Sequence, residues 1–200
     1  MIESGCPPAR VHLIADGIQP VQLRESFTRA DARHALADIN HDLQVPPDAP
    51  VVVHFHGNGE IVADYLDGFP GLIGRIGCNC FFAEFRGYGG STGTPQLGKM
   101  LEDVVPTIEA LQRPADEIIL FGRSVGSLFA VKAAEMFPQV TGMILESAIA
   151  DPVERLLLRV DPMELGTTPD RLVAAINEAI DIRGILSRFT RPVLIMHTRH

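Results

Sequence analysis

From about residue 50 onward, two kinds of segment alternate along the chain. Short runs rich in β-branched and aromatic residues are separated by longer segments in which apolar residues recur at helical spacing. The short runs occupy residues 50–57, 78–85, 117–122, 141–147 and 191–197. Such runs are typical of strands buried on both faces, and strands that alternate with helices form parallel sheets. The sequence therefore predicts an α/β fold with a mostly parallel, doubly wound sheet and helices on both faces.

The segments between the first four of these runs predict three helices, over about residues 60–75, 97–112 and 124–137. We expect the first helix to be broken near Pro70, because proline cannot donate a backbone hydrogen bond. Pro106 either kinks the second helix or lies in a first turn, where proline is tolerated.

Residues 1–50 have a weaker pattern than the rest of the chain. Residues 18–29 suit one or two strands, and residues 30–43 have helical spacing. We therefore expect residues 1–50 to add strands and a helix to the same domain, whose core is formed by residues 51–200.

Composition and charge argue against several classes of protein. The 200 residues are 46% hydrophobic and 21% charged, which is typical of soluble globular proteins. The net charge of −8 and the lack of a basic stripe argue against nucleic acid as a partner. No apolar run approaches the roughly 18 residues of a membrane span, and the N-terminus lacks the pattern of a secretory signal. We expect a cytoplasmic protein whose three cysteines are reduced.

A serine lies at the point where the third strand passes directly into a helix. Gly122, Ser124 and Gly126 form the pattern G-x-S-x-G. Small residues at the two glycine positions let the strand and the helix approach closely, while the serine adopts a strained backbone conformation in the turn. The hydroxyl is then held at the N-terminus of the helix, where free N–H groups stabilise negative charge. The alternative is that Ser124 only caps the helix, since serine is a favoured N-cap residue.

A second loop follows the first strand and reaches the same edge of the sheet. This loop has the sequence His56-Gly57-Asn58-Gly59. Acyl transfer needs two N–H donors for the oxyanion, one after the nucleophile and one from a neighbouring loop. The backbone amides of Val125 and Asn58 are the candidates.

Four motifs occur in an order and spacing that resemble the α/β-hydrolase superfamily. They are HFHGNGE (54–60), FRGYGGSTG (85–93), GRSVGS (122–127) and LESAIAD (145–151). They look most like the branch that contains serine aminopeptidase-type and BEM46-like proteins, and the resemblance covers residues 50–200. It implies that Ser124 is the nucleophile, that Asn58 and Val125 form the oxyanion hole, and that His56, Gly57, Gly122 and Gly126 support the motifs. It further implies hydrolysis of a small-molecule ester, or less favourably an amide or thioester, through an acyl-enzyme, with no cofactor and no metal.

The resemblance also implies that two catalytic groups are absent from these 200 residues. In this family the chain order is serine, acid, histidine, and the acid follows the strand that corresponds to residues 191–197. The position of that acid falls just after His200, so we expect a chain that lacks the last strand and helix of the fold. Glu146 and Asp151 follow the fourth strand and are possible substitute acids, and His200 is a possible substitute base.

Three further interpretations remain open. His54 and His56 lie two residues apart, as zinc ligands can, although we expect His54 to be a core histidine with satisfied hydrogen bonds and His56 to brace a loop. Because fold does not imply function, the chain is alternatively a non-catalytic binding module that retains the hydrolase fold. Residues 151–190 interrupt the sheet where a lid would insert, although their leucines alternatively pack on the core.

Overall fold

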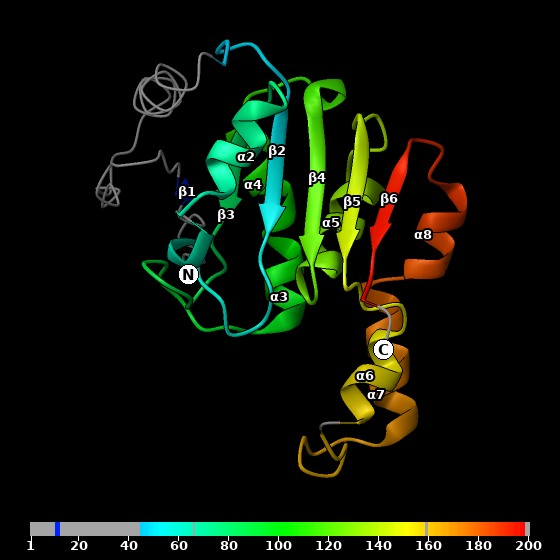
Figure 1. The fold of residues 1–200 in the computed structure, drawn as a ribbon. Coiled ribbons are helices and arrows are strands. Elements are labelled where there is room, and N and C mark those ends of the chain that lie inside the picture. Colours follow the sequence, from blue (N-terminus) through cyan, green and yellow to red (C-terminus); the bar gives the residue numbers. More distant parts are fainter. Residues whose placement is uncertain (1–10, 13–44, 66, 159, 199–200) are drawn as a thin grey trace, which may run out of the picture.

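The computed structural model describes residues 11–12, 45–65, 67–158 and 160–198, and within them a six-stranded sheet has the order β1-β3-β2-β4-β5-β6 (Figure 1). The strands are β1 (Val11–His12), β2 (Val51–Phe55), β3 (Asn79–Ala83), β4 (Ile118–Arg123), β5 (Gly142–Glu146) and β6 (Val193–Met196). β1 is antiparallel to β3, and all the other neighbours are parallel. The predicted mostly parallel sheet is confirmed. The strands and the helix expected at residues 18–43 lie outside the described residues.

Helices cover both faces of the sheet. They are η1 (Val62–Tyr65), α2 (Phe69–Arg75), α3 (Leu97–Glu102), α4 (Val104–Ala110), η2 (Ala115–Glu117), α5 (Gly126–Met136), α6 (Pro152–Leu157), α7 (Pro169–Ala179) and α8 (Ile182–Arg188). α2 packs against β3 on one face, whereas α5 lies against β4 on the other and contacts α4 and α8 (Figure 1). This arrangement confirms the predicted doubly wound fold. None of the helices that the structure describes is long and apolar enough to cross a bilayer.

The two faces of the sheet bury two hydrophobic cores. Along β2, Val51, Val53 and Phe55 contribute to the larger core beneath α5, while Val52 joins a smaller core on the α2 side. This alternation follows from the two-residue period of a strand, which directs successive side chains to opposite faces. A strand buried on both faces has no polar face, which is why the run Val51–Phe55 is apolar apart from His54.

The segment predicted as a helix over residues 60–75 is broken near Pro70, as expected, but its first part is only a short turn. The segment forms the short η1 turn and then α2, separated at Gly68, whose φ of 91° is left-handed. Pro70 lies in the first turn of α2, where its missing N–H costs no intrahelical bond. The break therefore precedes Pro70, because only glycine adopts such a φ readily.

The predicted helix over residues 97–112 is divided into α3 and α4 at Asp103. Pro106 lies in the first turn of α4, as one of the two sequence alternatives expected. Because proline has no N–H to donate to the carbonyl four residues earlier, the helical hydrogen bonds cannot continue from α3 through Pro106.

β6 forms one edge of the described sheet and is exposed on both faces. Its four residues are 37–66% exposed, with Ile195 the most exposed. Backbone hydrogen bonds attach it to β5, including one of 2.8 Å from the N–H of Ser147 to the carbonyl of Met196. The carboxyl end of β6 is thus joined to the loop that follows β5.

Candidate active site

Ser124 occupies a tight turn between β4 and α5. Its φ is +51°, in the left-handed region that non-glycine residues rarely adopt. The turn is held by a 2.8 Å bond from the Ser124 N–H to the carbonyl of Glu146 and a 3.0 Å bond from the Ser127 N–H to the carbonyl of Ser124. The N-cap residue of α5 is Val125, and no side chain caps the helix. The structure therefore does not support the alternative that Ser124 is an N-cap.

The two motif glycines lie where the backbone segments are closest. A Cβ atom on Gly126 would lie 2.0 Å from the carbonyl oxygen of Phe55, and one on Gly122 would lie 2.6 Å from the Cα of Ser127. Real Cβ atoms essentially never approach other atoms so closely. Glycine at position 126 lets the start of α5 pack directly against the end of β2, and glycine at position 122 lets the end of β4 lie against the start of α5.

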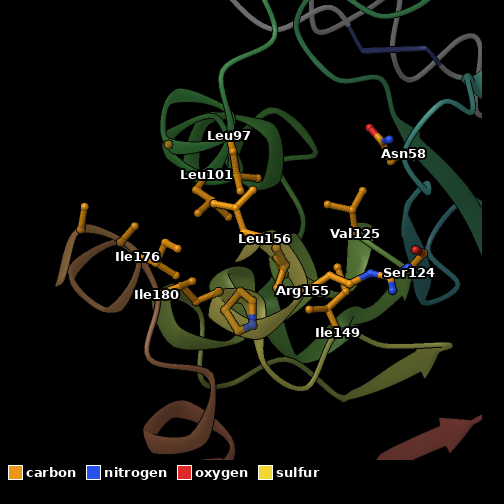
Figure 2. A pocket seen from close by; sticks show the side chains of 15 residues that line it. Asn58, Leu97, Leu101, Ser124, Val125, Ile149, Arg155, Leu156, Ile176 and Ile180 are labelled. Atoms are coloured by element: carbon orange, nitrogen blue, oxygen red, sulfur yellow. The ribbon is translucent and has the colours of Figure 1, made fainter. Parts of the chain in front are cut away.

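Ser124, Val125 and Asn58 line one cavity of about 460 Å³ at the carboxyl edge of the sheet. Figure 2 shows Ser124 and Asn58 at one end of this cavity and Ile176 and Ile180 at the other. Between these two ends the wall is mostly apolar. It includes Leu97 and Leu101 of α3, Leu128 of α5, Leu156 of α6, and Ile149 of the loop between β5 and α6. The volume and the apolar lining are those of a small-molecule site.

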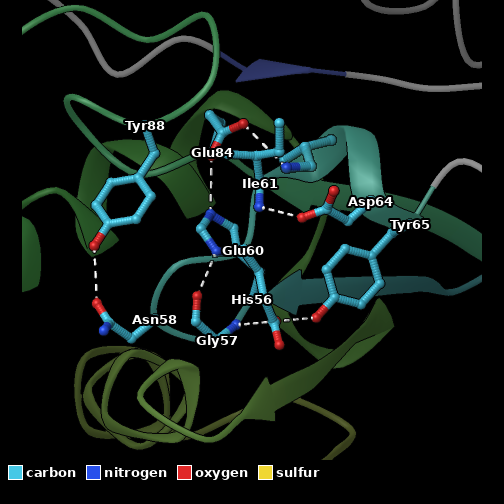
Figure 3. A network of polar contacts seen from close by, with 10 residues as sticks. His56, Gly57, Asn58, Glu60, Ile61, Asp64, Tyr65, Glu84 and Tyr88 are labelled. Atoms are coloured by element: carbon cyan, nitrogen blue, oxygen red, sulfur yellow. Dashed lines mark hydrogen bonds and ion pairs between the residues drawn. The ribbon is translucent and has the colours of Figure 1, made fainter.

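Two backbone amides at the Ser124 end of the cavity have no hydrogen-bond acceptor. Among the hydrogen bonds of the described residues, none uses the N–H of Asn58 or of Val125. The neighbouring N–H of Gly57 is instead occupied by a 2.6 Å bond to the carboxylate of Glu60. Asn58 itself is held by its side chain, whose Oδ1 accepts a 2.9 Å hydrogen bond from the hydroxyl of Tyr88 (Figure 3). Both N–H groups thus lack an acceptor within the described residues, and both residues line the cavity.

Glu60 connects the Asn58 loop to the Ser124 turn. Its carboxylate accepts hydrogen bonds from Gly57 N–H and from the hydroxyl of Tyr65, and it forms an ion pair with Arg123. Arg123 also lies 3.5 Å from the carboxylate of Glu146 on the neighbouring strand. Burial, together with the negative charge of Glu146, raises the pKa of Tyr65 to about 12, so its hydroxyl remains a donor. This charged brace, formed by Glu60, Arg123 and Glu146, was not predicted from the sequence.

Replacing Glu60 with glutamine is expected to slow reaction of Ser124 with a fluorophosphonate roughly tenfold, because small displacements of reacting groups are costly to rate. Glutamine keeps an acceptor for Gly57 but loses the ion pair with Arg123. The loss of stability should be small, about 0.2–1 kcal/mol, because the pair is partly exposed. The second-order labelling rate and the melting temperature measure the two effects separately.

The matched control for this substitution is Glu102→Gln, in an exposed glutamate of α3. This control should change neither the labelling rate nor the melting temperature. A Glu60→Gln protein that labels at the wild-type rate would show that the brace does not position the site.

His56 braces the same loop from the inside of the protein. One ring nitrogen lies 2.9 Å from the carbonyl of Gly57 and the other 2.9 Å from the carboxylate of Glu84, which also accepts a 3.0 Å bond from the N–H of Val62 (Figure 3). His56 and Glu84 are 1% and 5% exposed. Both ring nitrogens are engaged, so His56 is available neither as a general base for Ser124 nor as a metal ligand.

His54 differs from the expectation in its hydrogen bonds. It is a core residue, with its ring centroid 4.3–5.5 Å from those of Tyr65, Phe69, Phe82 and Phe121. However, neither ring nitrogen has a hydrogen-bond partner among the described residues. Those residues also contain no group of three side chains that could hold a metal ion, so nothing supports the zinc alternative.

His54 is expected to make the protein sensitive to acid. Burial lowers its pKa from 6.5 to about 3, and the nearby charges of His56 and Arg123 act in the same direction. Between pH 6.5 and about pH 3 the unfolded chain binds the proton and the folded chain does not, so stability is complete above pH 6.5 and falls with pH. In the His54→Phe protein, the free energy of unfolding should therefore fall by about 1.4 kcal/mol less per pH unit over this range than in the wild type.

The measurement is urea unfolding of wild-type and His54→Phe proteins at pH 7.5 and 5.0. Comparing the two proteins cancels the contribution of carboxylates, which both share. If both lose the same free energy of unfolding between the two pH values, His54 does not titrate in this way.

The side chains of the two possible substitute acids have other partners in the structure. Glu146 pairs with Arg123, and Asp151 caps α6 by accepting a 3.0 Å bond from the N–H of Glu154. Neither residue lines the Ser124 cavity, and the described lining contains no histidine and no carboxylate. His197 is exposed, with one ring nitrogen 3.1 Å from the carbonyl of Thr198. His200 lies outside the described residues.

The segment 151–190 supplies one side of the cavity. Pro152 and Leu156 of α6 and Ile176 of α7 face it. α6 and α7 project beyond the carboxyl ends of the strands, whereas α8 packs beside the sheet (Figure 1). The alternative that the leucines of this segment pack on the core does not hold for Leu158 and Leu165, which are 72% and 54% exposed.

A comparison with known protein families assigns the chain to the same superfamily as the four motifs. The family described as "Serine aminopeptidase, S33" matches residues 46–173, which is more than half of the chain. The chain belongs to this family. As a serine aminopeptidase-family protein it is a member of the α/β-hydrolase superfamily, as the resemblance of the four motifs predicted.

Curated relatives and solved structures extend this result. The serine aminopeptidase-family chain is 29% identical over 156 residues to alpha/beta hydrolase domain-containing protein 17C of Xenopus tropicalis and 28% identical to that of Homo sapiens. These matches cover 76% of this chain but 46% and 44% of the relatives, so the chain spans less than half of their length.

Two esterases have similar folds. Est1E from Butyrivibrio proteoclasticus has a TM-score of 0.57 at 21% identity, with 76% of this chain and 68% of that chain covered. The esterase EaEST from Exiguobacterium antarcticum has a TM-score of 0.53 at 20% identity, with 75% and 74% covered. At this level of identity the likeness concerns the fold of the serine aminopeptidase-family chain.

Proposed function

We propose that this protein hydrolyses a carboxylic ester of a small molecule through an acyl-enzyme on Ser124. The observation that carries the proposal is the position of Ser124, which lies in a left-handed turn at the wall of an apolar cavity. Two unpaired amides, those of Asn58 and Val125, belong to the same end of that cavity. A nucleophile on such a turn, with free N–H donors nearby, is the arrangement that acyl transfer requires.

The proposed reaction has two steps. In the first, Ser124 Oγ bonds to the carbonyl carbon, the hydroxyl proton passes to a base, and the carbonyl oxygen gains negative charge that the Asn58 and Val125 amides stabilise. The C–O bond to the alcohol then breaks, and the alcohol leaves with the proton. In the second step, water attacks the acyl-serine and releases the carboxylic acid and the free hydroxyl of Ser124. Amides and thioesters would follow the same sequence with a different leaving group.

We propose that the base is a histidine oriented by a carboxylate, and that both follow residue 200, as the chain order of the family implies. This assignment agrees with the described cavity lining, which has neither group. A serine hydroxyl without such a base is a weak nucleophile.

The test is covalent labelling with a fluorophosphonate, applied to the 200-residue chain and to the product of the complete gene. Intact mass should show one adduct on the gene product, and peptide mapping should place it on Ser124. The 200-residue chain should label more slowly. An adduct on another residue, or none on either protein, would contradict the proposal.

The second candidate is a non-catalytic binding module with the same cavity. The absence of a histidine and a carboxylate from the described lining favours it for the chain as it stands. Suppose that the product of the complete gene does not label but binds a small apolar ligand, and that a cavity-filling substitution such as Leu101→Trp removes this binding. The binding module is then the better description.

A further inference from the structure

The Ser124 cavity contains one charged side chain among its described lining residues, that of Arg155 on α6. The other polar lining side chains are those of Asn58 and Ser124. In Figure 2 the guanidinium end of Arg155 extends toward Ser124, away from Ile176 and Ile180 at the far end. A positive charge therefore lies close to the proposed reaction centre, on a chain whose net charge is −8.

Arg155 has no ionic partner within the described part of the chain. The acidic residue one helical turn before it, Asp151, is instead used by the N–H of Glu154 and lies 3.9 Å from Arg183. None of the ion pairs or side-chain hydrogen bonds found there involves Arg155. Arg155 is itself exposed, and it also lines the apolar cavity that contains Ser124.

We propose that Arg155 selects substrates that carry a carboxylate within a few bonds of the scissile carbonyl. The inference rests on the proposed function, whose substrate class it narrows. The apolar part of the substrate would lie along Leu101, Leu156 and Ile176, and the carboxylate would pair with the guanidinium near Ser124. Arginine suits this role because its planar fork binds a carboxylate through two parallel hydrogen bonds.

The carboxylate has two possible positions relative to the scissile bond, and the chemistry at Arg155 is the same for both. It belongs either to the leaving group, as in an acyl chain joined to a hydroxy acid or an amino acid, or to the acyl group itself. Both are amphiphilic monoanions with one apolar chain. A neutral ester of equal length would leave the guanidinium without a partner.

The experiment measures equilibrium binding to the full chain carrying Ser124→Ala, so that no covalent step is involved. For the leaving-group position, isothermal titration compares N-octanoylglycine with N-octanoylglycinamide. For the acyl position, it compares the monoamide of hexylmalonic acid with the diamide. In at least one pair the carboxylate should bind about tenfold tighter than the matched amide, as expected for a charge-assisted pair.

Arg155→Met should remove this preference, and Arg155→Lys should retain part of it, because lysine keeps the charge and loses the fork. The control is Arg183→Met, in an exposed arginine of α8 outside this cavity, which should keep the full preference. Equal binding of acid and amide in both pairs, failure of all four compounds to bind, or a preference that survives Arg155→Met would overturn the inference. Labelling of Ser124 by a fluorophosphonate is measured separately. If Ser124 labels but the protein shows no preference for the carboxylate, only the role of Arg155 is refuted.

Discussion

Ser124→Ala should abolish fluorophosphonate labelling and nearly abolish ester hydrolysis. The hydroxyl is the atom that bonds to phosphorus or to the acyl carbon, and no other hydroxyl lines the described cavity. In a serine hydrolase, loss of the nucleophile removes on the order of 10⁶ in kcat. Intact mass spectrometry and hydrolysis of p-nitrophenyl butyrate by the product of the complete gene measure the two effects.

Ser147→Ala is the matched control for this experiment. Ser147 follows β5 as Ser124 follows β4, and its φ of +48° is nearly the same, but it does not line the cavity. Its substitution therefore introduces alanine into the same backbone conformation without touching the proposed nucleophile. If Ser147→Ala lost labelling as Ser124→Ala does, the effect would come from the strained turns and not from the Ser124 hydroxyl.

Gly126→Val should prevent stable folding, with a loss of about 4 kcal/mol or more in the free energy of unfolding. The added side chain would meet the carbonyl oxygens of Phe55 and His56, at 2.0 and 2.6 Å from the Cβ. Backbone atoms in the sheet cannot move aside as the end of a long side chain can. Urea unfolding followed by far-ultraviolet circular dichroism measures the loss.

Gly98→Ala is the control for a glycine substitution in open space. No atom lies within 4 Å of a Cβ built on Gly98, which is in α3. Alanine is favoured over glycine in a helix by roughly 0.5–1 kcal/mol, so this substitution should be neutral or stabilising. A Gly126→Val protein as stable as wild type would mean that β2 and α5 do not approach as closely as described.

The fold could be predicted from the sequence because each buried strand has its own pattern. Runs such as Val51–Phe55 are apolar because both faces of the sheet are covered, and the helices between them bury one face only. The turn at Ser124 was also predictable, since a strand and a helix that meet without a loop require glycines around it. These properties depend on residues close together in the sequence.

The features that could not be predicted depend on residues far apart in the sequence. Whether the nitrogens of His54 find partners is decided by Tyr65, Phe82 and Phe121, which come from three other segments. The pairing of Glu60 with Arg123 likewise joins residues more than sixty positions apart. One signal was present, because Arg123 and Glu146 both end strands that meet at the same edge of a parallel sheet.

The position of Arg155 could not be derived from periodicity, because α6 lies beyond the carboxyl ends of the strands and packs mainly against α7. A charged residue in a short helix of this kind is expected to be solvated. The cavity that α6 helps to line is what gives the Arg155 side chain a specific environment.

A short path of backbone hydrogen bonds connects the exposed edge of the sheet to Ser124. The N–H of Ser124 donates to Glu146, and the next residue, Ser147, donates to Met196 at the end of β6. Two backbone hydrogen bonds and one peptide unit thus separate the exposed strand β6 from the proposed nucleophile. A displacement of β6 is therefore expected to shift the peptide unit between Glu146 and Ser147 and, through it, the backbone of the Ser124 turn.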